Sequence, residues 1–369
     1  MNTPDSSQCI TAADRPRSLL FLDKVFLKPR KANLRGVELF NLALIQDLAR
    51  NGFSLTIPIH YSWQDDFKHE QSSSPPFFCK VSGRLNLLNG LMAAWLVRRR
   101  QYREIILANV ANGLIPALWL LRIFRRPVPF VVFAHRMPSA RFMAALPKKT
   151  TRVICVNGII AAEFKKNGFK DVNVLFGHMN ADKFCPGDGS GAEAGSNEKK
   201  VNFCVVGFLD NAWKGADTAL AAFRALPKDV SAKCALHLAS YRSPPSVPEQ
   251  NIRVYEWLAP EAMPAWLRKM DVMIVPSRDE KVMRETFSLT MVEGMLTGLP
   301  IIASNLPVLA EKIADGGGYV FNDPGELSRL MASLASRPGL RAELGRQARR
   351  IALERYVWDA GKFISRYLV

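Results

Sequence analysis

Apolar runs alternate with polar loops along the chain, and their lengths predict an α/β protein. Between several of these runs lie segments whose apolar residues follow the helical period, such as 37–49 and 217–226. Strands that alternate with helices in this way are typical of doubly wound parallel sheets. The runs that we interpret as strands begin at Ser18, Phe53, Val128, Thr151, Val172, Val201, Cys234, Ile252, Asp271 and Pro300.

The segment 271–304 shows this order most clearly, as strand, loop, helix, turn and strand. Its two apolar runs predict a parallel pair of strands, and the apolar residues between them predict the crossover helix. In such a unit the ligand crevice lies beyond the carboxyl ends of the strands, where the loop enters the helix. We expect Glu285 at the start of that helix and Glu293 two turns later, so that both border one crevice.

The residues around these two glutamates match a known signature. They run Pro276-Ser277, then Glu285-Thr-Phe-Ser-Leu, then Glu293-Gly-Met-Leu-Thr-Gly-Leu-Pro before an apolar strand. This order closely resembles the nucleotide-sugar signature of GT4, the group 1 family of retaining glycosyltransferases. The spacing of the glutamates alone is weak evidence, since chance supplies such pairs in a chain of this size. The chain departs from the family at Thr286 and Ser288, where glycine is usual.

The resemblance implies the GT-B fold, an α/β architecture of two Rossmann-like doubly wound domains that face each other across a cleft. The expected boundary is the polar, Gly- and Ser-rich linker at 186–200. Residues 1–185 are then the N-terminal, acceptor-side domain, and residues 201–353 are the C-terminal, nucleotide-sugar-binding domain. In the family a terminal helix crosses back onto the first domain, and we expect 354–369 to form it.

A second part of the donor site follows the apolar run that ends at Gly207. The next loop resembles the family's Gly-Arg-Leu…Lys-Gly loop, in which arginine and lysine hold the donor diphosphate. Lys214 matches the lysine, but Phe208 stands in place of the arginine. A diphosphate leaving group needs cations to stabilise its developing charge, so we expect another cation to act instead. The candidates are Arg278, Lys281 and Arg284, of which we favour Arg284.

The resemblance also implies roles for single residues. Lys214 is assigned the diphosphate, Glu285 the donor sugar and Glu293 the ribose hydroxyls. Lys214 and Glu285 are expected to act in catalysis, together with His135. The full set of expected donor contacts is Gly36, Gly207, Lys214, Arg284, Glu285, Thr286, Phe287, Ser288, Leu289 and Glu293.

On the acceptor side, His135 directly follows the apolar run 128–134. A histidine at the carboxyl end of a strand faces the crevice in this fold, and the resemblance puts one near the sugar. The alternative is a structural histidine. Gly36 and Glu38 match the family's Gly-Gly-x-Glu loop, in which Arg35 takes the place of the first glycine. For Glu38 the alternative is a first-turn glutamate favoured by the helix dipole.

The net charge of +17 is concentrated in the first half of the chain. Residues 1–200 hold 29 Lys and Arg against 15 Asp and Glu, which favours an anionic partner for this half. Apolar helical segments end in basic clusters at 98–103 and 122–126, as is typical of helices at a membrane surface. The alternatives are core-facing helices with cationic ends, or a basic surface that contacts only solvent. The residues expected on the membrane side are Arg98, Arg99 and Arg100.

Composition and motifs narrow the function further. We expect a cytoplasmic protein, peripheral on the inner face of the cytoplasmic membrane, because the start of the chain lacks an apolar export signal and the six cysteines form no Cys-x-x-Cys pair. We expect no nucleic-acid partner, because no recognisable nucleic-acid module is present. No metal or other cofactor is expected, and the pair Asp65-Asp66 lacks further carboxylates for an oxygen shell.

Together these observations predict a retaining glycosyltransferase that moves a sugar from a nucleoside diphosphate sugar to a glycan or lipid-linked acceptor, in polysaccharide or glycolipid synthesis of the bacterial type. Two alternatives stay open. A nucleotide-sugar epimerase can be built on the same scaffold. A non-catalytic polyanion-binding protein would account for the basic composition, although it has no use for two carboxylates beside Lys214.

Overall fold

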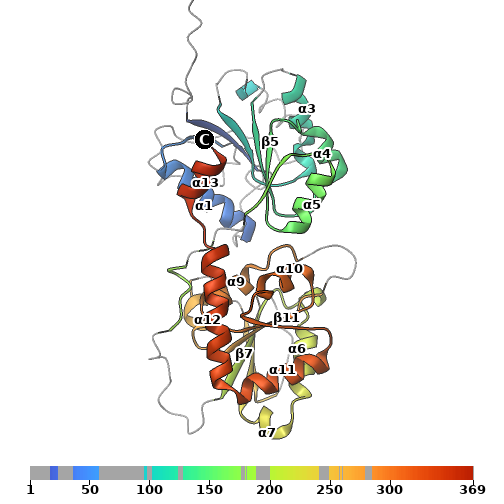
Figure 1. Ribbon diagram of the computed structural model, residues 1–369, viewed down its shortest axis with the longest axis vertical. Coiled ribbons are helices and arrows are strands. Elements are labelled where there is room, and N and C mark those ends of the chain that lie inside the picture. The colour runs from blue at the N-terminus through green and yellow to red at the C-terminus, as the bar shows by residue number, and fades with distance from the viewer. Residues whose placement is uncertain are drawn as a thin grey trace, which may run out of the picture. The chain divides into compact units, whose positions relative to one another are not determined.

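In the computed structural model, the chain builds one folded unit, passes through a second and returns to the first (Figure 1). Unit 1 comprises Met1–Leu175 and Asp359–Val369, and unit 2 comprises Phe176–Trp358. Each is described by itself. The structure describes residues 17–23, 36–57, 95–97, 102–123, 128–175, 179, 181–187, 200–240, 249–256, 258–259, 261–278 and 285–368.

The described strands of unit 1 form a parallel sheet in the order β2-β1-β3-β4-β5-β6. The chain forms β2 on one side of β1 and then returns to form β3 on the other side. Doubly wound sheets open a crevice at such a reversal, beyond the carboxyl ends of the strands. The strands are β1 (Ser18–Leu22), β2 (Ser54–Thr56), β3 (Glu104–Leu107), β4 (Phe130–Ala134), β5 (Thr151–Cys155) and β6 (Asp171–Val174). The helices are α1 (Gly36–Arg50), η3 (Asn112–Leu114), α3 (Ile115–Ile123), α4 (Ala140–Ala145), α5 (Gly158–Lys166) and α13 (Ala360–Tyr367).

Buried aromatic and β-branched residues form the central strands of unit 1. All five residues of β4, Phe-Val-Val-Phe-Ala, are buried, as expected for a strand with both faces covered. The helices that follow β4 and β5 start at polar caps. Ser139 accepts a hydrogen bond from the Phe142 amide at the start of α4, and Asn157 accepts one from the Ile160 amide at the start of α5.

The last helix, α13, belongs to unit 1. Its Phe363 ring lies 5.6 Å from the ring of Phe133 in β4, and Arg152 donates a hydrogen bond to its Tyr367 carbonyl. The helix predicted at 354–369 starts later than expected. Asp359 caps α13 by accepting a hydrogen bond from the Lys362 amide, and the preceding residues up to Arg355 belong to another helix.

The described strands of unit 2 form a second parallel sheet, in the order β12-β11-β10-β7-β8-β9. The chain moves outward from β7 through β8 to β9, and then returns to form β10 on the other side of β7. The reversal therefore lies between β7 and β10. The strands are β7 (Val201–Gly207), β8 (Cys234–Ser240), β9 (Ile252–Glu256), β10 (Val272–Val275), β11 (Ile301–Ser304) and β12 (Gly318–Phe321). The helices are η4 (Ala212–Lys214), α6 (Ala216–Arg224), α7 (Lys228–Ser231), α8 (Met263–Leu267), α9 (Leu289–Leu296), α10 (Pro307–Ala310), η5 (Glu311–Ile313), α11 (Pro324–Ser336) and α12 (Pro338–Arg355).

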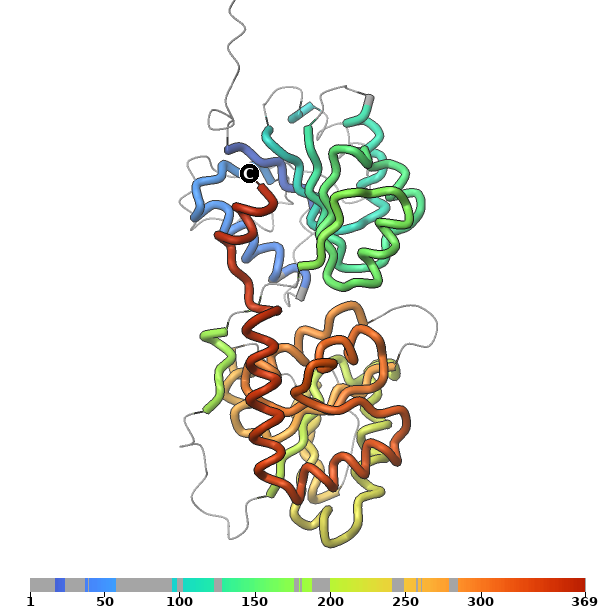
Figure 2. The backbone as a smooth tube through the Cα atoms, viewed as in Figure 1, coloured from blue at the N-terminus to red at the C-terminus, as the bar shows by residue number. Residues whose placement is uncertain are grey.

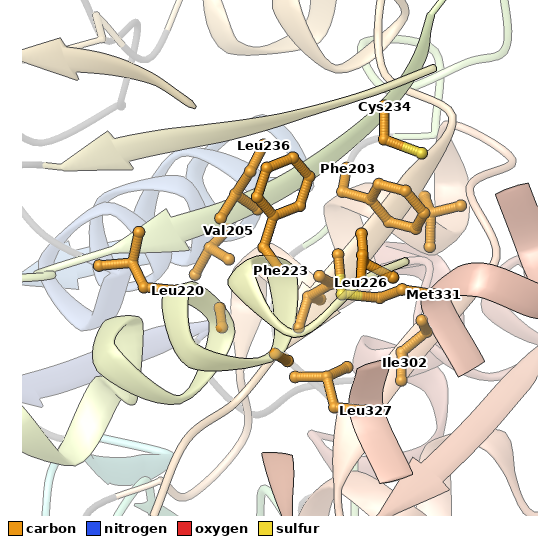
Figure 3. Close-up of a cluster of buried hydrophobic side chains, with 14 of the residues drawn as sticks. Phe203, Val205, Leu220, Phe223, Leu226, Cys234, Leu236, Ile302, Leu327 and Met331 are labelled. Carbon is orange, nitrogen blue, oxygen red and sulfur yellow. The ribbon is translucent and has the colours of Figure 1, made fainter. Parts of the chain in front are cut away.

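The core of unit 2 lies between its sheet and helices α6 and α11 (Figure 3). Phe203 of β7 and Leu236 of β8 are fully buried there, and Phe223 of α6 and Met331 of α11 pack against the same cluster. Burial of each such side chain contributes about 1.5–3 kcal/mol. This layer covers one face of the sheet and fixes β7, from whose end the loop toward α6 begins.

Helix α12, the long red helix of unit 2 in Figure 2, packs against α9. Its Arg349 donates a hydrogen bond to the Leu296 carbonyl at the end of α9, where intrahelical partners are lacking. Both units thus have the predicted α/β class with doubly wound parallel sheets. Within the described residues, no helix is both long and apolar enough to cross a membrane.

Candidate functional site

The reversal between β7 and β10 brings two loops of unit 2 into direct contact. Gly215, between η4 and α6, has a φ of +69°, and a Cβ atom on it would lie 1.9 Å from the Pro276 carbonyl oxygen. Only glycine accepts this backbone conformation without strain and leaves room for the neighbouring carbonyl. The loop after β7 therefore lies tightly against the loop after β10.

Arg278 connects these two loops through hydrogen bonds. Its amide donates a hydrogen bond to the Trp213 carbonyl at 2.7 Å, and its guanidinium donates to the Ala212 carbonyl at 2.8 Å. The same guanidinium pairs with Asp217 at 2.5 Å. Arg278 was one candidate for the cation missing at Phe208. Its contacts instead hold the η4 loop in place, and the other two candidates, Lys281 and Arg284, lie outside the described residues.

Lys214 and Glu285 form an ion pair at this junction, although they lie 71 residues apart in the sequence. Lys214 Nζ is 2.6 Å from Glu285 Oε2, and the side chains are only 13% and 8% exposed. The Ser277 hydroxyl donates to the same carboxylate oxygen at 3.1 Å, and Ser304 donates to the Ser277 carbonyl at 2.5 Å. The ends of β7, β10 and β11 thus converge on one carboxylate, which accepts two hydrogen bonds, one of them from a cation.

Other predicted donor residues lie around this pair. A Cβ atom on Gly207 would meet the Lys214 side chain at 3.4 Å, so the lysine stem lies across the glycine. The Lys214 ammonium also lies 4.5 Å from the centre of the Trp213 ring. Ser277 belongs to the signature quoted in the sequence analysis, where it was given no role, and it directly follows the Pro276 that ends an apolar run. The signature and this position at the carboxyl end of a strand were its signals in the sequence.

The structure corrects the position of Glu285. Helix α9 begins at Leu289, so Glu285 lies in the preceding turn and not at the start of the helix. The helix begins late because Ser288 has a left-handed backbone, with a φ of 59° and a ψ of 76°. This conformation costs a non-glycine residue about 1–2 kcal/mol, which gives a physical reason for the glycine usual in the GT4 signature. The Ser288 hydroxyl is buried and has no hydrogen-bond partner among the described residues.

Glu293 lies on α9, within the same unit as Lys214 and Glu285. Burial raises the pKa of Glu293 to about 7, while the charge of Lys183 acts to lower it. The carboxyl group is therefore partly protonated at neutral pH. Thr286 and Phe287 belong to the turn before α9, and Phe287 is buried.

The remaining predicted residues that the structure describes belong to unit 1. His135 follows β4 directly, and its ring lies 4.9 Å from Phe40 and 6.3 Å from Phe133. Burial lowers the pKa of His135 to about 4, so the ring is neutral at pH 7, and its Nε2 atom has no hydrogen-bond partner among the described residues. Gly36 begins α1 and Glu38 lies in the first turn of α1.

Unit 1 also contains a buried polar pair that the sequence analysis missed. Asn41 of α1 donates a hydrogen bond to the carboxylate of Asp23, which directly follows β1. The signal available in the sequence was the same as for His135, a polar residue at the carboxyl end of an apolar run. Arg98, Arg99 and Arg100, predicted on the membrane side, lie outside the described residues, as does Asp65-Asp66.

Comparison with known proteins finds a match in the part of the chain that holds these residues. The model of the family Glycosyl transferases group 1 matches residues 200–337, which include the β7 loop, the ion pair and α9. The ion pair and Glu293 thus lie inside the matched region, whereas His135 and Glu38 lie outside it.

Relatives by sequence match about a quarter of the chain. An uncharacterized 41.2 kDa protein in the cps region of Klebsiella pneumoniae is 36% identical over 90 residues, which are 24% of each chain. A D-inositol 3-phosphate glycosyltransferase of Streptomyces avermitilis is 32% identical over 102 residues, 27% of this chain and 21% of the relative. The chain thus spans only about a quarter of the length of these relatives.

Solved structures match nearly the whole chain in fold. A glycosyltransferase from Rickettsia africae has a TM-score of 0.71 at 13% identity, over 93% of this chain and 94% of the other. HepE from Anabaena, solved in complex with UDP-glucose, has a TM-score of 0.66 at 15% identity, over 94% and 97%. These matches confirm the GT-B fold expected from the sequence.

Proposed function

We propose that this protein is a retaining glycosyltransferase, which transfers a sugar from a nucleoside diphosphate sugar to an acceptor hydroxyl. The observation that carries the proposal is the Lys214–Glu285 ion pair at the strand reversal of the matched region. Ligands bind at such reversals in open α/β sheets. A cation paired with a carboxylate there suits a donor with an anionic diphosphate and a hydroxylated sugar.

The diphosphate is assigned to Lys214. Negative charge grows on the diphosphate as the bond to the sugar breaks, and a positioned cation stabilises that charge most strongly in the transition state. Lys214 directly precedes Gly215 and the start of α6, where backbone amides and the helix dipole also favour an anion. One ammonium hydrogen is used by Glu285, and the others have no hydrogen-bond partner among the described residues and can bond a donor.

The sugar and the ribose are assigned to the two glutamates. Glu285 is fixed by Lys214 and by the Ser277 hydroxyl, so its second oxygen can accept a hydrogen bond from a sugar hydroxyl without reorganising. Glu293 is assigned the ribose hydroxyls. Transfer with retention proceeds at the front face of the sugar without a protein nucleophile, as the GT4 resemblance implies.

Unit 1 is assigned the acceptor. The neutral His135 ring has a nitrogen atom with no hydrogen-bond partner among the described residues, and this atom can bond a sugar or acceptor hydroxyl. Glu38, in the first turn of α1, is assigned to the same side. Neither residue lies in the part of the chain that the family model matches.

The acceptor is proposed to be a glycan or lipid-linked molecule at the inner face of the cytoplasmic membrane, in polysaccharide or glycolipid synthesis of the bacterial type. Trp119 of α3 is 47% exposed, and the Arg122 guanidinium lies 4.9 Å from the centre of its ring. An exposed tryptophan beside an arginine is suited to the boundary between lipid headgroups and acyl chains. This pair supports the membrane side predicted from the basic clusters.

Product analysis with a panel of nucleotide sugars tests the function. UDP-glucose is the first member, because HepE was solved with it, and GDP- and dTDP-sugars with membrane extract or glycan acceptors complete the panel. Transfer with retained anomeric configuration, unaffected by a chelator since no metal is proposed, is the expected result. An isomerised nucleotide sugar would identify an epimerase, and binding of heparin without any turnover would identify a polyanion-binding protein.

A further inference from the structure

Lys312 is a lysine whose side chain is buried inside unit 2. It lies in η5, and only 2% of the residue is exposed. Its ammonium donates a hydrogen bond to the Val308 carbonyl at 2.9 Å. The ammonium also lies over two aromatic rings, 4.6 Å from the centre of Phe287 and 5.6 Å from that of Tyr356. We call this arrangement of Lys312, Phe287 and Tyr356 the aromatic cage.

Folding alone does not favour a lysine at this position. Lysine is almost never fully buried without an opposite charge, because its ammonium loses its hydration. Burial lowers the pKa of Lys312 to about 8, while the charges of Glu311 and Glu285 act to raise it. The side chain is therefore mainly protonated at pH 7. A methionine would fill the same space beside aromatic rings without a charge to desolvate, so the lysine points to a role beyond packing.

One ring of the aromatic cage belongs to the turn that carries the site. Phe287 lies between Glu285 and Ser288, whose backbone is left-handed. A strained residue persists only where its surroundings hold it. The cation over the Phe287 face and the edge contact of Phe287 with Tyr356, at 5.9 Å between ring centres, hold this turn from the protein interior.

We propose that Lys312 is a positioning residue of the donor site: its caged ammonium fixes the turn 285–288 through Phe287. The anchoring of the turn rests on the geometry of the aromatic cage, whereas its effect on donor use rests on the proposed function. Lys312 does not touch the donor in this scheme and acts through Phe287.

A pH dependence follows from this role. Among the described residues, the charges of Glu311 from η5 and Glu285 from the site turn act on Lys312, and the titratable Tyr356 from the end of α12 lies beneath its ammonium. Burial raises the pKa of Tyr356 to about 12, so this group stays neutral while Lys312 titrates. As the pH rises through about 8, Lys312 loses its proton and with it the attraction to both rings. Activity is expected to fall over that interval.

The substitution Lys312→Met in the full-length chain tests the proposal, with Lys228→Met at an exposed position as the matched control. Lys312→Met is expected to lower kcat/KM about tenfold, to leave the melting temperature unchanged or raise it, and to remove the fall in activity above pH 8. Lys312→Arg keeps the charge and should recover part of the activity. Ser288→Gly on the Met background should recover more, because glycine adopts the left-handed conformation without strain.

Hydrogen exchange of the amides in 285–292 is the readout that needs no turnover. It is expected to become faster in Lys312→Met and to stay unchanged in Lys228→Met. Unchanged exchange, or a wild-type kcat/KM in Lys312→Met, overturns the proposal. So does a melting temperature that falls together with activity, because it would assign Lys312 a structural role. If the wild-type protein transfers no sugar while exchange responds, the proposed function fails and the anchoring of the turn stands.

Discussion

Lys214 and Glu285 are the residues on which the proposed function depends, and the two side chains form an ion pair. Because both side chains are largely buried, removing one leaves the other in surroundings that solvate it poorly. Effects of single substitutions therefore contain this penalty in addition to any lost contact with a donor. The experiments on this pair need a double variant for that reason.

Lys214→Ala is expected to lower kcat more than it weakens donor binding, because the charge that Lys214 faces grows as the glycosidic bond breaks. The loss of one such cation corresponds to about 3 kcal/mol in the activation free energy. Steady-state kinetics with the donor found in the panel measures it, with Lys269→Ala at an exposed position as control. Adding Glu285→Gln to Lys214→Ala should restore stability without restoring kcat. An unchanged kcat in the single variant would remove Lys214 from the site.

The two glutamates are expected to give different kinetic signatures. Glu285→Gln should lower kcat and leave nucleotide affinity near the wild-type value, because Glu285 faces the reacting sugar. Glu293→Gln should raise the donor KM and weaken nucleotide binding with little change in kcat, because a ribose contact is equal in the ground and transition states. Calorimetry with the free nucleotide separates the two. Equal damage to nucleotide binding by both substitutions would contradict the assignment.

Glu293 is also expected to make donor binding depend on pH. Its raised pKa of about 7 means that the carboxyl is mostly protonated below pH 7 and ionised above it. Hydrogen bonds that the ionised form accepts from ribose hydroxyls are stronger than those accepted by the protonated form. Nucleotide affinity should therefore increase as the pH rises through about 7. Titrations at pH 6, 7 and 8 check this, and Glu293→Gln should show a flat profile.

At the scale of elements, most of the described strands could be predicted because their apolar patterns are local, whereas β3 and β12 were not among the predicted runs. Every run interpreted as a strand lies in or directly beside a strand of the structure. The turn before α9 could not be placed, because its left-handed Ser288 depends on contacts made elsewhere in unit 2. Lys312 was missed for the same reason. In the sequence it lies between Glu311 and Ile313, and only the tertiary fold buries its ammonium among aromatic rings.

Gly215 is expected to be the most sensitive glycine of the donor site. Gly215→Ala places a Cβ atom 1.9 Å from the Pro276 carbonyl and imposes a positive φ on alanine. We expect unit 2 to lose about 2–4 kcal/mol of unfolding free energy, with loss of the Lys214 placement. Denaturant unfolding and nucleotide binding measure both effects. Gly339→Ala is the matched control, because a Cβ atom there meets nothing within 4 Å. Equal stability of both variants would contradict the close contact of the two loops.

For the whole molecule, we expect reversible binding to anionic membranes through unit 1. Each cation near an anionic bilayer contributes about 1 kcal/mol, and the attraction is screened as the Debye length falls from about 10 Å at 0.1 M salt to about 3 Å at 1 M. Co-sedimentation with vesicles should require anionic lipid, fall steeply with salt and weaken when Arg98, Arg99 and Arg100 become Gln. The control is a variant in which three lysines of unit 2, Lys228, Lys233 and Lys269, are replaced by Gln. If the protein does not co-sediment with anionic vesicles at low salt, this result would favour an acceptor in solution.

The return of the chain to unit 1 has a consequence for how the protein is made. Unit 1 holds the first described strand, but α13, which packs on β4, is translated after the whole of unit 2. During synthesis the sheet of unit 1 therefore lacks α13, so part of its apolar surface stays uncovered. Unit 2 is continuous in sequence and can fold as soon as it leaves the ribosome. The unit assigned to the donor would then mature first, and the unit assigned to the acceptor would be the one that depends on chaperones until α13 has been made.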